Sequence, residues 1–422
     1  MRGGAGHRWP HRGTAAVTGT RITALDVTRG FAVMGILAMN IIAFAWPEPV
    51  YMTPMAGGGS NITDVTAWAV NYMLIDSKMR GLFSMLFGAS ALLVMDRADA
   101  AGRNIARTHI ARMAVLGLFG LLHYYLIWWG DILFLYAACG MLLLMLRNWS
   151  VRALAITGAV LIALQALFYG SALLAIRLAH DGGAASVAKE YDRFVGQFTA
   201  GSTQFAEQML VYRGDYAAIL YHRFIEHGTQ PFAGVAQFGA ETLGLMLIGM
   251  ALFKSGLLGG AWPIGRLMTW CGRCLALGII ANLALLVWQV ATGLDAWVVA
   301  TSTIVWSVPF DVVMSIGYVA LFMLLAQRFA ESAIIARVAA TGRAAFTNYL
   351  GTSVVMTSLF YGYGLGLFGE VSRAACYLFV LGAWALMLLW SKPWLERYAY
   401  GPMEWLWRSL ARWQLQPIRS HA

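Results

Sequence analysis

Charged residues are scarce in this chain of 422 residues: Asp, Glu, Lys and Arg together make up 12% of it. An ordinary soluble domain carries about 25% charged residues. Hydrophobic residues instead reach 59%, and the mean hydropathy is +0.64. A soluble fold cannot bury that much apolar surface, because its core shares the chain with a wetted exterior. The composition therefore excludes a soluble enzyme and a disordered protein, and it predicts an all-α, polytopic bundle of membrane helices.

Cysteine is also rare, with four residues, so a framework of disulfide bonds is not expected. Cys271 and Cys274 have redox or metal spacing, but no second pair and no suitable His lies nearby in the sequence. Walker, dinucleotide-binding and zincin motifs are absent as well. We accordingly expect no metal site and no tightly bound cofactor.

Long apolar runs predict about ten membrane spans, since a hydrocarbon core needs about 20 apolar residues per helix. The first 20 residues hold no apolar run and read as a cytoplasmic tail rather than a signal peptide. Pro309 is expected to kink the eighth span. The ten expected spans are 30–46, 67–95, 112–129, 131–147, 152–178, 236–254, 266–292, 296–327, 344–366 and 374–391.

The net charge of +10 comes from Lys and Arg that lie between the apolar runs, where they are topology signals rather than a nucleic-acid surface. Basic residues alternate from loop to loop along the chain, which predicts that both termini are cytoplasmic. Loop 96–111, for example, carries three Arg, whereas loop 47–66 carries none. We expect a multi-pass membrane protein surrounded by lipids.

The spans group into two five-helix units, 21–178 and 236–410. An outer segment, 179–235, separates them and is expected to form one or two amphipathic helices near the membrane surface. Short cytoplasmic tails at 1–20 and 411–422 complete the chain. The number of copies in the membrane is left open.

Charged side chains at membrane depth are the first candidates for a site, because they cost about 2.5–3.5 kcal/mol to insert. Asp26 and Arg29 share a helix face at the cytoplasmic end of the first span and either bind a phosphate or form a local ion pair. Arg80 either sits at a break between two half-helices, where it would form an anion site, or belongs to an amphipathic helix. Glu241 and Asp311 are single carboxylates inside spans, suited to a base, a proton site or a counter-ion for Arg80.

His123 is the histidine expected at membrane depth, roughly 16 Å from the inner boundary of the third span. Asp131 opens the next span, and Tyr136 descends toward the level of His123 in an antiparallel hairpin. His123 could act as a general base oriented by Tyr136 or Asp131. Alternatively, His123 is a neutral structural residue and Asp131 caps a helix. In the outer segment, His222, Glu226 and His227 have a spacing that could hold a metal, but a wet amphipathic helix face is the favoured interpretation.

Two groups of motifs resemble a known family. They are Leu25-Asp26-Val-Thr-Arg29-Gly30, Leu86-Phe87-Gly88 and Gly130-Asp131-Ile132-Leu133 in the first half, and Gly342-Arg343-Ala-Ala-Phe-Thr347-Asn348-Tyr349-Leu350, Gly362-Tyr-Gly-Leu-Gly366-Leu-Phe-Gly369 and Gly401-Pro402-Met-Glu404-Trp405-Leu-Trp407-Arg408 in the second. The chain resembles the YeiB-like bacterial membrane proteins, whose C-terminal region is the domain of unknown function 418. The likeness covers nearly the whole chain after residue 20, and it implies a multi-pass protein of the bacterial inner (plasma) membrane.

The Leu-Asp-x-x-Arg-Gly opening is also similar to those of the acyltransferase-3 and heparan-α-glucosaminide N-acetyltransferase families. That resemblance implies transfer of an acyl group from cytoplasmic acyl-CoA to a glycan or lipid acceptor, with Asp26, Arg29 and Arg80 on the donor. The acyltransferase-3 pattern places a His where this chain has Asn40, so Asn40 would stabilise the carbonyl oxygen and His123 would be the base.

Three functions stay open at this point: a transmembrane acyltransferase, a transporter of a small solute or lipid-linked sugar, and a non-catalytic membrane protein. In the transporter, Glu241, Asp311 and Arg80 would carry coupling or substrate charges.

Overall fold

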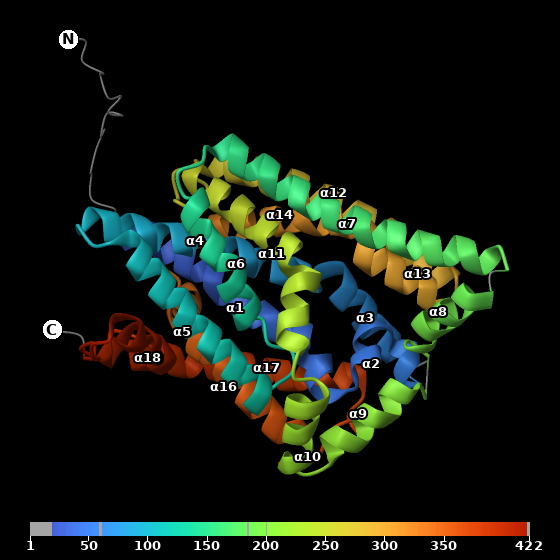
Figure 1. Ribbon diagram of the computed structural model, residues 1–422. Helices are drawn as coiled ribbons and strands as arrows, with labels where there is room; N and C mark the ends of the chain where they lie inside the picture. The colour runs from blue at the N-terminus through green and yellow to red at the C-terminus, as the bar shows by residue number, and fades with distance from the viewer. Residues whose placement is uncertain (1–18, 59–60, 184, 200, 420–422) are drawn as a thin grey trace, which may run out of the picture.

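The computed structural model describes residues 19–58, 61–183, 185–199 and 201–419. Within this part of the chain the regular elements are helical, apart from one isolated bridge between Tyr398 and Arg419. The protein is an all-α, polytopic helical bundle, as the composition predicts (Figure 1). Most of the tail predicted at 1–20 lies outside the described residues.

The first half of the chain supplies the helices α1 (Gly19–Ala45), α2 (Glu48–Met52), η1 (Pro54–Gly57), α3 (Ile62–Leu74), α4 (Lys78–Ala100), α5 (Ile105–Leu126), α6 (Leu133–Leu146) and α7 (Val151–Asp181). The outer segment forms α8 (Ala185–Gly196), α9 (Thr203–Arg213), α10 (Tyr216–Tyr221) and the π-helical turn η2 (His222–Glu226). This is more helix than the one or two amphipathic elements expected there.

The second half supplies α11 (Gln230–Lys254), α12 (Ile264–Ala291), α13 (Ala296–Thr301), the π-helical turn η3 (Ser302–Trp306), α14 (Val308–Arg328), α15 (Ala333–Arg343), α16 (Ala345–Phe360), α17 (Arg373–Arg397) and α18 (Pro402–Arg412). The eighth expected span, 296–327, is therefore broken at η3. Pro309 stands in the first turn of α14, where a missing N–H is tolerated.

Eight helical segments of described residues are long and apolar enough to cross a membrane, with α3 and α4 counted as one. The expected spans 131–147 and 344–366 correspond to shorter helices, α6 with 14 residues and α16 with 16. Their sequences carry the apolar runs, but turns at each end shorten the helices themselves.

Helix α1 forms the centre of the bundle, and 83% of its most apolar stretch is buried within the protein. It packs on α4, α14, α15, α16 and α17. Gly342 of α15 lies so close to the backbone of Asp26 that a Cβ would have no room. Small residues allow membrane helices to approach in this way.

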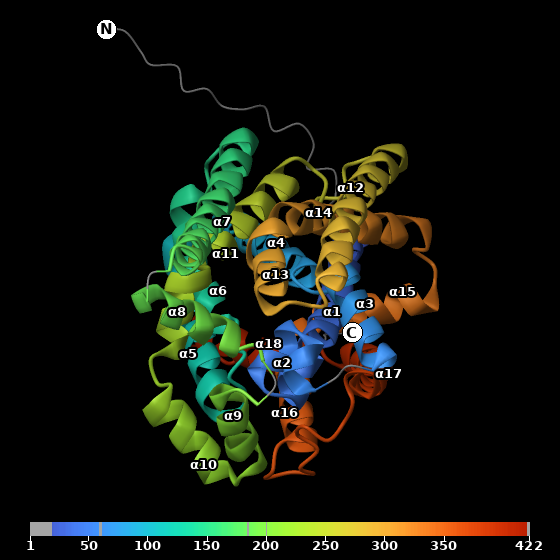
Figure 2. The same cartoon turned by 90° about the vertical axis from the view of Figure 1, so that its right-hand side faces the viewer.

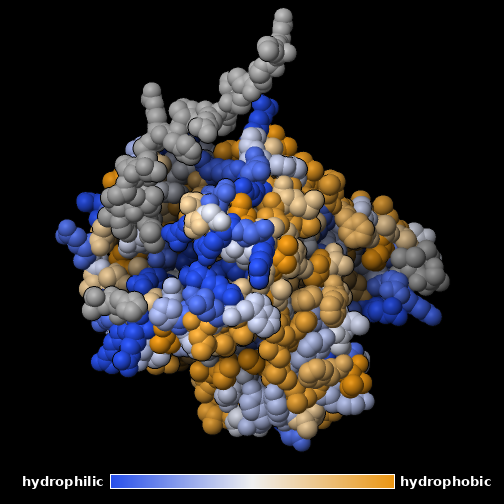
Figure 3. Space-filling view, turned by 60° about the vertical axis from the view of Figure 1, so that its left-hand side comes forward, coloured by the Kyte–Doolittle hydropathy of each residue, from blue (hydrophilic) through white to orange (hydrophobic). Residues whose placement is uncertain are grey.

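Helices α7 and α12 lie at the periphery, and only 11% and 17% of their apolar stretches are buried. Their exposed side chains include Leu167, Phe168 and Ile280. Apolar side chains cover the flank of the molecule in Figure 3, whereas hydrophilic ones gather on part of the end that faces the viewer. This division is the one expected of a protein surrounded by lipid.

Candidate functional site

A cavity of about 620 Å³ opens between the two halves of the bundle. Its walls come from α1, α4, α11 and α14, and its outer part is bordered by α2, α8, α9 and η3. Figure 2 looks toward the end of the molecule where α2, α3, α8, α9 and α13 meet. The charge alternation in the sequence predicts that this end faces outward.

A break between α3 and α4 places charged residues on the cavity wall. Asp76 and Ser77 occupy the break, and Ser77 has φ 59° and ψ −38°, a left-handed region that non-glycine residues rarely adopt. Strained backbone of this kind costs about 1–3 kcal/mol and persists where the surrounding structure enforces it. The alternative of a half-helix break, raised by the sequence, is the one observed.

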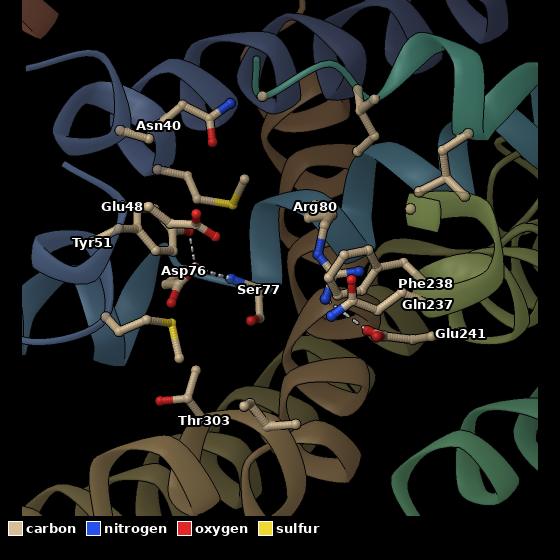
Figure 4. Close-up of a pocket in the computed structure, with 18 of the residues that line it drawn as sticks. Asn40, Glu48, Tyr51, Asp76, Ser77, Arg80, Gln237, Phe238, Glu241 and Thr303 are labelled. Atoms are coloured by element: carbon tan, nitrogen blue, oxygen red, sulfur yellow. Dashed lines mark hydrogen bonds and ion pairs between the residues drawn. The ribbon is translucent and has the colours of Figure 1, made fainter. Parts of the chain in front are cut away.

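Asp76 points into the cavity and is held by two hydrogen bonds (Figure 4). The Tyr51 hydroxyl donates to Asp76 Oδ1 over 2.6 Å, and the Ser77 amide donates to the same oxygen over 2.9 Å. No cation of the described residues is bonded to Asp76. Its carboxylate is therefore fixed in direction and available to a ligand.

Arg80 lies one turn into α4 and forms an ion pair with Glu241 of α11 across 2.8 Å. Gln165 of α7 braces the same glutamate: its amide nitrogen donates to Glu241 Oε2 over 3.3 Å, and its oxygen accepts from the Glu241 backbone over 2.8 Å. Both Arg80 and Glu241 line the cavity (Figure 4). Glu241 is thus the counter-ion of Arg80, one of the three roles that its position allowed.

Asp311 pairs with a different cation. Its Oδ1 lies 2.8 Å from Nζ of Lys78, whose side chain is 1% exposed. Lys78 also donates over 2.5 Å to the carbonyl of Tyr72, near the C-terminal end of α3. A cation there satisfies carbonyls that the broken helix leaves unpaired.

Asn40 extends from α1 into the same cavity (Figure 4). Among the described residues its side-chain amide has no hydrogen-bond partner. An amide group without a partner inside a membrane protein is unfavourable unless water or a ligand satisfies it. Asn40 therefore marks a position where a polar ligand would gain hydrogen bonds.

His123 forms a hydrogen bond with Asp131, with 2.9 Å between His123 Nδ1 and Asp131 Oδ1. The other Asp131 oxygen accepts from the backbone of Phe134 over 2.8 Å and begins α6. His123 is 1% exposed, and its Nε2 has no partner in the described structure. Asp131 lines the cavity, but His123 is not among the described residues that do. The ring thus lies behind the cavity wall.

Tyr136 does not orient His123. Its hydroxyl lies 2.6 Å from Oγ of Ser84 on α4, and the ring packs against Phe87. Because α6 begins only at Leu133, Tyr136 falls on the helix face that turns toward α4. Of the two expected partners of His123, Asp131 is the one in contact.

Asp26 and Arg29 form their ion pair at 2.8 Å, and Arg29 also donates to Oγ of Ser90 over 3.0 Å. They do not share a site with Arg80. Arg29 lies beside Ser90, ten residues and roughly 15 Å along α4 from Arg80. Asp26 and Arg29 of α1 thus lie beside the middle of α4, whereas Arg80, expected on the same donor, lies in its first turn.

The motif at 401–408 has a structural role that the sequence did not reveal. Glu404 accepts hydrogen bonds from the backbone of Phe346 at 2.7 Å and from the hydroxyl of Thr347 at 2.6 Å. It thereby closes the N-terminal end of α16, where a carboxylate is favoured. Burial raises the pKa of the Glu404 carboxyl above its usual range, partly offset by these hydrogen bonds.

The fold and the cavity define a polytopic membrane protein with a polar, charged pocket between its two halves. The family model described as protein of unknown function (DUF418) matches residues 252–414. The chain is 32% identical over 411 residues to the uncharacterized protein YeiB of Escherichia coli (strain K12), covering 92% of this chain and 96% of that protein. It is 30% identical over 416 residues to the uncharacterized protein YxaH of Bacillus subtilis (strain 168), covering 95% and 97%. This chain belongs to the YeiB-like DUF418 family. No solved structure matches it.

Proposed function

We propose that this chain is an acyltransferase of the bacterial inner membrane, which binds a glycan or lipid acceptor in the outer cavity and uses acyl-CoA as donor. The observation that carries the proposal is the presence in one cavity of a fixed carboxylate, Asp76, and an unpartnered amide, Asn40. Acyl transfer to a hydroxyl requires a group that accepts a proton and a donor for the developing oxyanion. These two side chains supply both.

In the proposed step, the acceptor oxygen forms a bond to the acyl carbonyl carbon while Asp76 takes the hydroxyl proton. The carbonyl electron pair moves onto its oxygen, toward which the amide of Asn40 donates. The carbon–sulfur bond then breaks as that electron pair returns. The thiolate leaves with the sulfur electrons and receives the proton that Asp76 took.

This assignment replaces His123 as the proton acceptor. A base must reach its acceptor directly or through one water, and His123 lies behind the wall formed in part by Asp131. We assign His123 a positioning role: it orients Asp131, which borders the cavity and begins α6.

The donor phosphates would lie at the cytoplasmic end of α1, where Arg29 contacts Asp26 and Ser90. Gly342 packs directly on the backbone of Asp26. The next residue, Arg343, adds a second cation to this end of α1. Arg29 and Asn40 are eleven residues apart on α1, so the donor would extend roughly 16 Å between them.

A transporter is the second candidate, and the two ion pairs favour it. Arg80–Glu241 and Lys78–Asp311 join α4 to α11 and α14 inside the membrane region. Buried ionisable residues of this kind often serve coupling ions or substrate charges. The same cavity would then bind a solute that crosses the membrane unchanged.

One experiment separates the two. The purified chain in nanodiscs is incubated with acetyl-CoA labelled in the acetyl group and with envelope lipids and glycans extracted from the host bacterium. The proposal expects label in the extracted material and release of free thiol in equal amounts. No label in any fraction at full protein integrity would reject acyl transfer, and solute uptake by proteoliposomes would then support the transporter.

A further inference from the structure

The outer segment brings together three side chains, one glutamate and two histidines, of the types that are typical of zinc sites. Glu207 of α9, His222 at the start of η2 and His227 after it offer ligand atoms that all lie within 4.8 Å of one another. The sequence predicted the two histidines as possible ligands, but not Glu207. The turn after α9 brings the histidines back to Glu207, and no local sequence pattern predicts that turn.

The π-helical turn creates this arrangement. The His227 amide donates to the carbonyl of His222 over 2.9 Å, a bond that spans five residues. The two imidazole rings consequently lie 4.3 Å apart, centre to centre. In a regular α-helix, residues five apart would point in different directions. Single π turns are frequent at functional sites.

Acidic side chains surround the buried ring of His222. His222 is 5% exposed, yet its Nδ1 faces two carboxylates, Glu226 at 2.6 Å and Glu207 at 3.8 Å. Two acidic groups converging on a buried imidazole form an arrangement that a divalent cation would stabilise.

We propose that Glu207, His222 and His227 bind one Zn²⁺ ion. Two imidazoles and a carboxylate are a preferred zinc set, with bonds of about 2.0–2.2 Å. Ligand atoms around such an ion lie roughly 3.4 Å apart, whereas these atoms lie within 4.8 Å of one another, so the side chains must close in by up to about 1.4 Å. Glu207 can do so, since 48% of its side chain is exposed.

Arg223 is the cation nearest in the chain and would oppose a metal. Its guanidinium is directed at the rings of Tyr212 and Tyr361, 5.8 and 5.7 Å from their centres. Glu207 and Glu226, both of which face His222, offset the charge of Arg223. The net formal charge of Glu207, Glu226 and Arg223 is −1, which favours a cation.

The site would fix the border of the cavity. Glu207 lies on α9 between Gln204 and Gln208, both of which bond to Glu48 of α2, with distances of 3.0 and 2.7 Å. Zn²⁺ would fasten α9 to the start of α11 through η2. This inference does not depend on acyl transfer, because it concerns the outer segment alone.

The test uses the full chain, purified in detergent without a polyhistidine tag and stripped with EDTA. Zn²⁺ is titrated in competition with a chromophoric chelator. We expect one tightly bound Zn²⁺ per chain in the wild type, and loss of that binding in Glu207→Gln and His227→Gln. His180→Gln removes a half-exposed histidine on α7 and serves as the matched control, with binding unchanged.

His222 is buried, so His222→Gln could fail to fold, and the two exposed positions carry the test instead. X-ray absorption of the loaded protein should show nitrogen and oxygen neighbours at about 2.0–2.1 Å. No stoichiometric Zn²⁺ in the wild type, or equal binding by wild type, Glu207→Gln and His227→Gln, would overturn the proposal.

Discussion

Arg80 and Glu241 are 161 residues apart in sequence, yet they form a 2.8 Å ion pair that links the two halves of the bundle at the cavity wall. Their side chains keep 23% and 13% exposure. The pair therefore remains open to a ligand while it connects α4 to α11.

Breaking this pair should destabilise the protein. Arg80→Gln or Glu241→Gln leaves one charge without its partner, which costs about 3 kcal/mol, the low end for a buried pair because the cavity admits solvent. The double variant removes both charges and should recover much of that loss. Thermal unfolding of the four proteins in the same detergent measures the coupling.

Additive losses in the double variant would show that Arg80 and Glu241 do not stabilise each other. Lys78→Met offers a comparison, since Lys78 is 1% exposed and its partner Asp311 is 7% exposed. We expect a larger loss there than at Arg80, because less solvent reaches the orphaned carboxylate.

Topology follows from the charge pattern and can be tested directly. Reporter fusions at 182, 215 and 364 should face outward, and fusions at 102 and 400 should face the cytoplasm. A cytoplasmic result at 215 would invert the outer segment and remove the cavity from the outer side. Activity of paired phosphatase and fluorescent reporters gives the result.

The raised pKa of Glu404 predicts that the stability of the folded protein depends on pH. Burial raises the pKa of Glu404 in the folded protein above its ordinary value of 4.5. A raised pKa in the folded state means that the neutral form is preferred there. The contribution of Glu404 to the stability of the folded protein is therefore complete below pH 4.5. It is lost as the pH rises through the pKa of Glu404 in the folded state.

Glu404→Gln keeps an acceptor for the Phe346 amide without a titrating group. The difference in unfolding free energy between wild type and Glu404→Gln should therefore favour the wild type at pH 4 and shift toward the variant by pH 8. Chemical unfolding at both pH values measures it. A constant difference would mean that the pKa of Glu404 is the same in the folded and unfolded protein.

His123→Gln separates a positioning role from a catalytic one. Gln can still bond to Asp131, so we expect acyl transfer to fall by about tenfold, the low end for the loss of a contact that orients a functional side chain. The pH profile of the rate should keep its shape. A complete loss of transfer with normal protein levels would restore His123 as the base.

The sequence predicted the helices better than the side-chain contacts between them. Apolar runs and basic loops located the spans, and the separation of eight positions between His123 and Asp131 placed them at one turn. The ion pair of Arg80 with Glu241 depends on how α4 and α11 pack, which no local pattern encodes. Asp131 beginning α6 fixed the direction of Tyr136, and that cap could not be distinguished in advance from a catalytic carboxylate.

The sequence predicted only some of the residues that form the site at the helix break. Arg80 stood out at a possible helix break, but the strained Ser77 and the Tyr51 hydroxyl that hold Asp76 did not. Tyr51 belongs to the short helix α2, for which the sequence has no periodic signal, and its role arises from the fold around it.

In the proposed reaction, Asp76 is the proton acceptor of acyl transfer in the outer cavity. Transfer of labelled acetyl from acetyl-CoA to extracted envelope material should fall at least about 100-fold in Asp76→Asn, since general-base catalysis contributes 10²–10⁴-fold. Asp295→Asn, a change at the N-cap of α13 where Asn serves equally well, should transfer at the wild-type rate. Equal transfer by Asp76→Asn and the wild type would contradict the account.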